Sequence, residues 1–132
     1  MGRVEDKILI VEKFLDELEE VVPDSFELYM NHLEKRLSSQ KAFENIIESV
    51  NDLAILIIKE KGLGLPVEDR RAFEILVSDR FMSEDLAFKL RKAKGMRNFL
   101  VHRYDNINDE IVYEAIVGEI VRDAKEFLEL LK

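Results

Sequence analysis

Apolar residues recur at steps of three and four along the whole chain, the spacing that lines up side chains on one face of an α-helix. No stretch alternates between apolar and polar at every second residue, as a half-buried β-strand would. The pattern predicts an all-α protein, folded as an up-and-down bundle of about five helices. The first three helices are expected at about residues 3–20, 26–61 and 66–78.

The helix boundaries follow from residues that stop or start a helix. Residues 23–25, Pro-Asp-Ser, separate the first two helices, and residues 62–66, Gly-Leu-Gly-Leu-Pro, end the second. Pro66 suits the first turn of the short third helix. The fourth helix is expected to begin at Ser83 and the fifth at Asn108, because each is a good N-cap followed by two acidic residues.

The length of the chain, 132 residues, allows one substantial core but hardly two, so residues 1–132 are expected to form one domain. The N-terminus runs straight into a charged helical pattern that does not resemble a secretion signal. The longest apolar run, residues 53–58, should be buried on every side but is far too short to span a membrane. We therefore expect a cytoplasmic protein with no membrane partner.

The fourth helix carries apolar residues on two faces. One stripe holds Leu86, Leu90, Ala93, Leu100 and Tyr104, with Arg97 in the middle of it. Phe88, Gly95, Phe99 and His102 fall on roughly the opposite side. A single small bundle can bury only one of these faces, so the pattern predicts a homodimer through this helix. Gly95 then marks close backbone approach, or alternatively only a bend in the helix.

The charges are distributed unevenly. The net charge is −8, yet residues 86–104 hold no acid and six bases, which leaves 14 bases against 28 acids elsewhere. A phosphate-bearing partner is therefore expected at this segment, where Lys92, Lys94 and Arg103 are candidate phosphate ligands. The alternative is that the basic run is only a solvated face.

The composition argues against a metal site or a bound cofactor. The chain has no cysteine and only two histidines, of which His32 lies in a polar stretch and is expected at the surface. No Glu-x-x-His motif is present, and residues 62–64, Gly-Leu-Gly, lack the lysine and hydroxyl residue of a phosphate-binding loop. We expect neither a metal nor a cofactor.

Arg97 and His102 are the candidate catalytic residues. Five positions separate them, so on an ideal helix they point about 140° apart. A distorted helix, the reach of the arginine, or a site built from two chains could bring them together. Asn98, four residues before His102, could hydrogen-bond it and fix its tautomer. Two alternatives remain. His102 could be an ordinary histidine at a helix C-terminus, where a positive charge compensates the negative end of the helix dipole. Arg97 could be the buried partner of Glu44 or Asp52.

The sequence around these residues resembles the HEPN superfamily, in its HepT-like toxin branch. The arginine, the histidine five residues later and Tyr104 match the arginine-x4-histidine-x-tyrosine motif of that family. Residues 62–66, 70–76 and the helix start at Ser83 are also similar, so the resemblance covers essentially the whole chain.

This resemblance implies a dimeric, metal-independent endoribonuclease toxin that cleaves RNA with Arg97 and His102, supported by Asn98. It also implies a nucleotidyltransferase-type antitoxin as partner, which silences the toxin by attaching AMP to Tyr104. RNA supplies its own 2′-hydroxyl nucleophile, so the protein needs only a base, an acid and positive charge on the phosphate. The alternatives are a noncatalytic subunit that binds substrate or nucleotide for a nucleotidyltransferase, and a purely structural helical adaptor.

Overall fold

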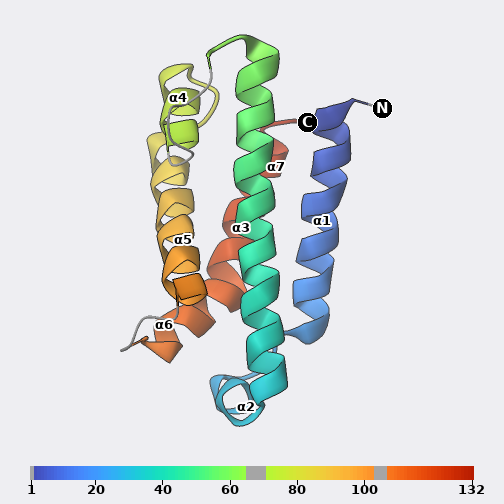
Figure 1. The fold of residues 1–132 in the computed structure, drawn as a ribbon, viewed down its shortest axis with the longest axis vertical. Helices are drawn as coiled ribbons and strands as arrows, with labels where there is room; N and C mark the ends of the chain where they lie inside the picture. Colours follow the sequence, from blue (N-terminus) through green and yellow to red (C-terminus); the bar gives the residue numbers. More distant parts are fainter. Residues whose placement is uncertain (1, 65–70, 103–106) are drawn as a thin grey trace.

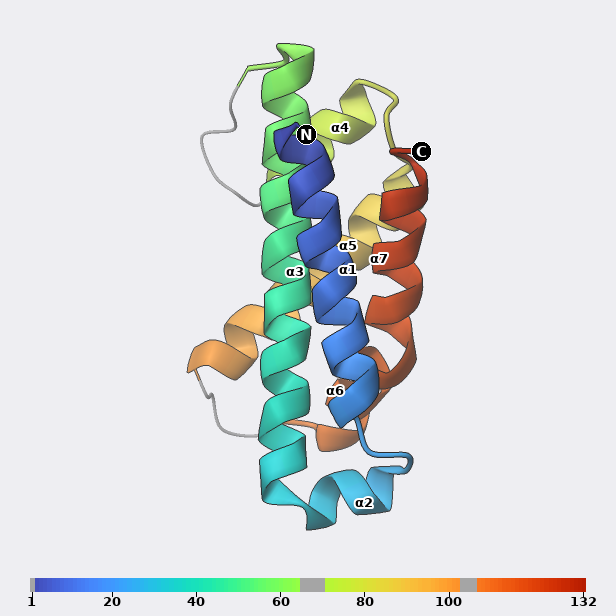
Figure 2. The ribbon, with the colours of Figure 1, turned by 90° about the vertical axis from the view of Figure 1, so that its right-hand side faces the viewer.

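The computed structural model describes residues 2–64, 71–102 and 107–132, and all regular elements within these ranges are helices. The longest is α3 (Leu33–Lys61), which α1 (Arg3–Val21) flanks on one side and α5 (Glu84–His102) on the other (Figure 1). The helix α7 (Ile120–Glu129) lies behind α3, and both chain ends lie at the same end of the bundle (Figures 1 and 2). The expected all-α bundle is confirmed.

The core is built mainly from the apolar stripes of these four helices, and the shorter helices add further buried residues. Val11 and Leu18 of α1, Phe43 of α3, Leu90 of α5 and Phe127 of α7 are all almost fully buried in one cluster. In the apolar run 53–58, residues 53, 54, 57 and 58 are buried, but Ile55 and Leu56 are only half-buried. The run therefore faces the core on most of its circumference rather than on all of it.

The second predicted helix is wrong in one respect, because the structure divides it at His32. Residues Phe26–Asn31 form the separate short helix α2, and His32 has an extended backbone (φ −121°, ψ 92°) before α3 begins. Tyr29 of α2 is fully buried and its ring lies 5.1 Å from that of Tyr113, so packing turns α2 away from the axis of α3. The sequence has no glycine or proline at this bend. As expected, His32 itself is exposed.

The last predicted helix is a continuous helical segment that contains a π-helical turn. It consists of α6 (Asp109–Glu114), a π-helical turn η2 (Ala115–Glu119) and α7. Asn108 caps its start, accepting hydrogen bonds from the backbone of residues 110 and 111, as the sequence indicates. The short helix α4 (Ala72–Ser78) ends where predicted, while the expected start at Pro66 lies outside the described residues.

Two features of the bundle position the candidate site. The helices α3 and α5 run antiparallel, and the C-terminal end of α5 protrudes beyond α3, away from α1 and α7 (Figure 2). Within the described ranges, no helix is long and apolar enough to cross a membrane.

Candidate functional site

Arg97 lies on the side of α5 that packs against the bundle. Its stripe neighbours Leu86, Leu90 and Leu100 are buried, and about a third of the arginine side chain is exposed. Long charged side chains of this kind bury their stem along apolar surface and keep the charged head within reach of water. The guanidinium is thus carried by the core-facing stripe and yet remains accessible.

The guanidinium of Arg97 has two polar partners. Its Nη2 lies 3.5 Å from the Oε2 carboxylate oxygen of Glu48 on α3, and its Nη1 donates to the Oδ1 of Asn98 at 3.3 Å. Its Nε is buried and finds no hydrogen-bond partner among the residues that the structure describes. An arginine–carboxylate pair was one of the alternatives at this position, but the acid is Glu48.

The two acids considered from the sequence, Glu44 and Asp52, are engaged elsewhere. Glu44 pairs with Lys41 on its own helix at 3.7 Å, and Asp52 pairs with Lys7 of α1 at 3.6 Å. Glu48 was missed because the choice among acids one turn apart depends on the register of α3 against α5. No local sequence signal encodes that register.

His102 is the last residue of α5, and it is exposed on the protruding end of that helix. The helix is unbroken from residue 84 to residue 102, passing through Gly95 without interruption. Helical geometry therefore keeps Arg97 and His102 about 140° apart around the axis. Among the three ways of bringing them together, the reach of the arginine and a site shared by two chains remain.

The outer face of α5 consists of Phe88, Gly95, Phe99 and His102. All four residues are exposed, and the two phenylalanines expose 58% and 38% of their surface. A Cβ built on Gly95 meets no atom within 4 Å in this chain. The second apolar face predicted for this helix is therefore present and partly exposed to solvent in the single chain.

The candidate phosphate ligands differ in their surroundings. Lys94 is half-buried; its Nζ donates to the Oδ1 of Asn51 on α3 at 2.9 Å and lies 5.9 Å from the ring centre of Phe73. Lys92 is exposed beside a small hollow between α5 and the η2–α7 segment. Arg103 and Tyr104 lie outside the described residues.

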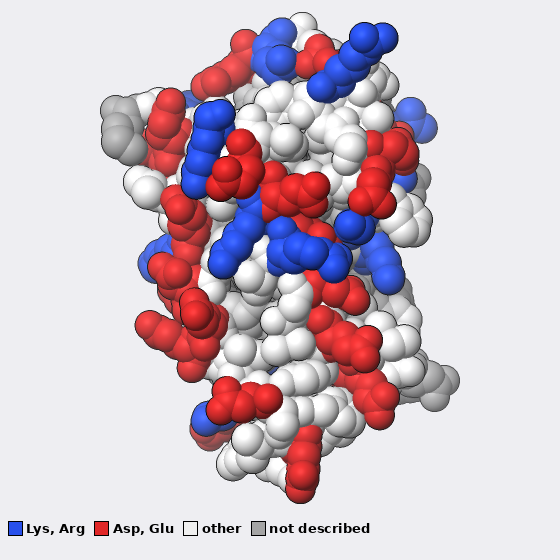
Figure 3. All heavy atoms as spheres, turned by 180° about the vertical axis from the view of Figure 1, so that it is seen from behind, with Lys and Arg blue, Asp and Glu red and all other residues white. Residues whose placement is uncertain are grey.

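The basic run holds no acid of its own, but acids from outside it pair with some of its bases in the folded chain. Acidic side chains reach it from other helices and from the first turn of α5 itself: Arg91 pairs with Glu74 and Glu84, and Lys89 pairs with Asp85 at 2.9 Å. The hydrogen bond that Lys89 donates to the carboxylate of Asp85 raises the pKa of Lys89 above its usual value. On the rear of the molecule, several basic side chains form a band near the middle, and acidic side chains lie around it among uncharged surface (Figure 3). Charge is therefore less polarised in space than along the sequence.

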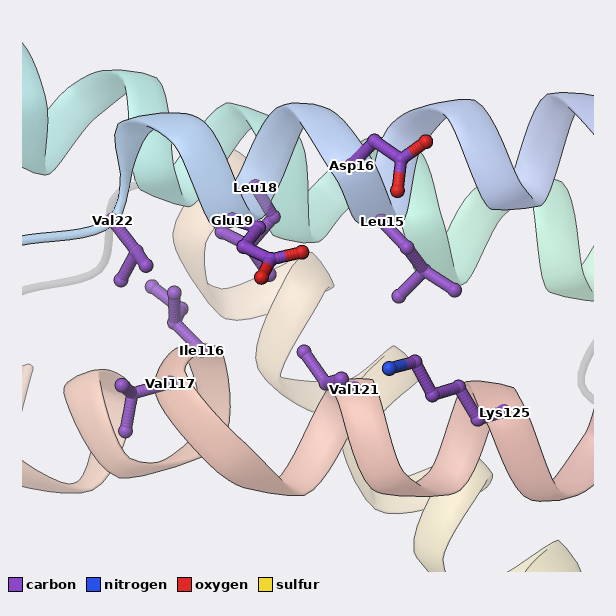
Figure 4. A pocket seen from close by; sticks show the side chains of 9 residues that line it. All are labelled: Leu15, Asp16, Leu18, Glu19, Val22, Ile116, Val117, Val121 and Lys125. Atoms are coloured by element: carbon purple, nitrogen blue, oxygen red, sulfur yellow. The ribbon is translucent and has the colours of Figure 1, made fainter.

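A separate pocket lies between α1 and the η2–α7 segment. It has a volume of about 220 Å³, an apolar floor that includes Leu15 and Val121, and the polar groups Asp16, Glu19 and Lys125 at its edge (Figure 4). None of the candidate site residues lines it. No group of three or more potential metal ligands occurs in the part of the chain that the structure describes.

Comparison with known sequences gives a consistent result. The sequence model of the ribonuclease HepT-like family matches residues 11–131. A putative RNase of Archaeoglobus fulgidus is 30% identical over 80% of each chain, and the mRNA nuclease HepT of Shewanella oneidensis is 31% identical over 64% of this chain. The latter alignment spans 63% of the Shewanella protein. The tRNA nuclease HepT of Aphanizomenon flos-aquae is 26% identical over 86% of this chain and 77% of its own length.

Solved structures share the same fold. The tri-AMPylated HEPN toxin of Shewanella oneidensis, in complex with its MNT antitoxin, superposes with a TM-score of 0.90 at 23% identity, covering 99% of this chain and 98% of that one. A toxin–antitoxin structure with AMP-PNP has a TM-score of 0.87 at 22% identity, with 97% and 96% of the two chains covered.

Proposed function

This chain belongs to the ribonuclease HepT-like family, and from that membership we propose that it is a metal-independent endoribonuclease toxin using Arg97 and His102. The observation that carries the proposal is the family match over residues 11–131, which includes both residues. The geometry supports it: an accessible arginine and an exposed histidine lie near the protruding end of one helix. Relatives named mRNA and tRNA nucleases point to RNA as the substrate. We propose the cytoplasm, where such RNA is found, as the place of action.

The proposed reaction is a transesterification within RNA. A base removes the proton of a 2′-hydroxyl, whose oxygen attacks the adjacent phosphorus, while an acid protonates the departing 5′-oxygen. The products are a 2′,3′-cyclic phosphate and a 5′-hydroxyl end. An imidazole such as that of His102 exchanges protons near neutral pH, and the guanidinium of Arg97 can donate two hydrogen bonds to the phosphorane oxygens.

We further propose that the whole chain acts as one domain and pairs with a second copy through the outer face of α5. The exposed Phe88 and Phe99 give this face an apolar character that water solvates poorly. Gly95 lies between them with open space above it, so the backbone of a second helix can approach closely. Such a dimer places the His102 of each chain on the shared face and lets two histidines divide the acid and base roles.

Lys92, Lys94 and Arg103 are proposed to bind the phosphates that flank the cleaved bond. The exposed Lys92 and the half-buried Lys94 lie five and three residues before Arg97 on α5. Asn98 supports the site by accepting a hydrogen bond from Arg97. The ammonium groups act as point charges for the RNA backbone, whereas Arg97 supplies the directed pair of donors.

A nucleotidyltransferase-type antitoxin is the proposed protein partner, and Tyr104 is the proposed site of AMP attachment. The tri-AMPylated toxin of Shewanella oneidensis, solved with its MNT antitoxin, supports this assignment. Tyr104 follows the end of α5 by two residues. A bulky anionic adduct there would exclude a phosphate by its size and by like charge. Mass spectrometry after incubation with the antitoxin and ATP tests this, and AMP found on another residue instead would exclude Tyr104.

Expression in cells, with RNA binding measured in parallel, tests the enzymatic function. We expect the wild-type chain to arrest growth and His102→Ala to restore it while RNA binding stays within about threefold of wild type. If wild type binds RNA without arresting growth, and Arg97→Ala weakens that binding while His102→Ala does not, the chain is a noncatalytic binding subunit.

A further inference from the structure

The helix α3 presents polar side chains to two of the proposed site residues. Glu48 and Asn51, three positions apart, share one face of α3, and they contact Arg97 and Lys94, three positions apart on α5. Because the helices are antiparallel (Figure 1), the pairs follow in order along the α3–α5 seam. An ion pair at 3.5 Å is followed, about one turn on, by a hydrogen bond at 2.9 Å.

Glu48 stands on a rigid support. Its helix neighbours Ile46, Ile47 and Val50 are fully buried, and Ser49 is bonded by its side chain to the carbonyl of Ile46. Arg97 lies in the C-terminal half of α5, the half that leads to the protruding end (Figure 2). A carboxylate carried by this anchored stretch of α3 can therefore restrict the many rotamers of an arginine on α5, and an arginine side chain carries about 2 kcal/mol of rotamer entropy.

We propose that Glu48 is a positioning residue for Arg97: it orients the guanidinium before RNA binds. This inference rests on the proposed function of Arg97. A guanidinium has five N–H groups, and Glu48 and Asn98 each contact one of its terminal nitrogens. The second hydrogen on each of these nitrogens is left to meet a phosphate. Glu48 thus acts through Arg97 and does not itself need to touch the substrate.

The charge of Glu48 gives the proposal a distinctive kinetic signature. A carboxylate near the phosphate site opposes RNA binding, so its removal should leave binding unchanged or tighter. Loss of orientation should slow the chemical step at the same time, because a misplaced catalytic group forfeits the advantage of proximity. A residue that only stabilised the fold would not separate kcat from KM in this way.

The first test is a double-mutant cycle on RNA cleavage by the full chain. We expect Glu48→Ala to lower kcat about tenfold, with KM unchanged within about twofold or lower, and Glu48→Gln, which keeps an acceptor oxygen, to recover most of the loss. In an Arg97→Ala background, Glu48→Ala should cause no further fall. The matched control is Asp52→Ala, which removes the 3.6 Å pair between α3 and Lys7 and should keep kcat within about twofold. An unchanged kcat in Glu48→Ala, or an equal fall without Arg97, would overturn the proposal.

A second measurement tests whether Glu48 orients Arg97 and does not depend on RNA cleavage. The buried Nε–H of Arg97 gives an NMR signal in the ¹⁵N-labelled chain, identified by its loss in Arg97→Lys. We expect Glu48→Ala to shift this signal and speed its exchange with water, and Asp52→Ala to leave it in place. An unmoved signal in Glu48→Ala contradicts the positioning role even if wild type cleaves RNA. Conversely, if the wild type cuts no RNA but the Arg97 signal shifts in Glu48→Ala, the proposed ribonuclease function is wrong while Glu48 still orients Arg97.

Discussion

At the scale of single residues, the environment of Arg97 is the informative one. An arginine in the middle of an apolar stripe is costly unless its charge is compensated, and α3 supplies the compensation through Glu48. The pair is partly exposed on both sides, so it adds at most about 1 kcal/mol to stability. The proposed role of the pair is therefore to orient the guanidinium of Arg97 rather than to stabilise the fold.

Substituting Arg97 should separate catalysis from folding. We expect Arg97→Ala to lower cleavage by about 10²- to 10³-fold, the usual loss when a group that stabilises transition-state charge is removed. Arg97→Lys keeps the charge but loses the two-pronged donor, so it should retain only part of the activity. Urea unfolding of both variants should stay within about 1 kcal/mol of wild type. Full activity of Arg97→Ala would remove this residue from the mechanism.

At the scale of elements, the sequence predicts where the helices lie far better than which side chains meet. The caps at Ser83 and Asn108 and the break at Gly62 are local signals, and each stands where predicted. The bend at His32 has no such signal, because the burial of Tyr29 against residues far along the chain produces it. The partner of Arg97 depends likewise on helix register, which periodicity alone does not encode.

We expect the packing that bends α2 away from α3 to lower the stability of the protein at high pH. Burial raises the pKa of Tyr29, since the charged phenolate is poorly solvated there; Gln40, which donates to its oxygen at 2.9 Å, only partly offsets this. Because the folded pKa exceeds the unfolded one, the folded state binds more protons above about pH 10 and loses stability as the pH rises. Tyr29→Phe should lessen the fall of the urea midpoint between about pH 9.5 and 11. An identical fall in wild type and Tyr29→Phe would exclude this cause.

The outer face of α5 is the element that should join two copies. We expect Gly95→Glu to convert a dimer into a monomer with its helical content intact, because a long charged side chain would stand where the second helix approaches. Gly118→Glu is the matched control, since Gly118 is also an exposed helical glycine with open space around it, but on η2. Light scattering during gel filtration measures the mass. Dimers that persist in Gly95→Glu would place the interface on another surface.

At the scale of the whole molecule, the proposed function requires an acidic protein to bind an acidic polymer. The net charge of −8 repels RNA at long range, and several bases of α5 are already paired with acids. In the proposed function, RNA binding therefore depends on few contacts, those of Lys92, Lys94, Arg97 and Arg103. So small a number of contacts favours a compact binding site around the cleaved phosphate over a broad RNA-binding surface.

The salt dependence of the RNA-binding constant measures how many phosphates the protein contacts. Four phosphate contacts on single-stranded RNA predict that the logarithm of the binding constant falls with the logarithm of salt concentration at a slope of about −3. Lys92→Ala should reduce the slope by about 0.7. Fluorescence anisotropy with an RNA carrying a 2′-deoxy sugar at the cleavage position gives both values without turnover. A slope near −8 would indicate a much larger interface.

The most direct test of the central claim is to incubate the purified chain with end-labelled RNA in excess EDTA, beside Arg97→Ala and His102→Ala variants verified as folded. We predict cleavage by the wild type alone, leaving 2′,3′-cyclic phosphate ends. RNA left intact by the wild type, or cut equally by the His102→Ala variant, would contradict the assignment of a metal-independent ribonuclease to these two residues.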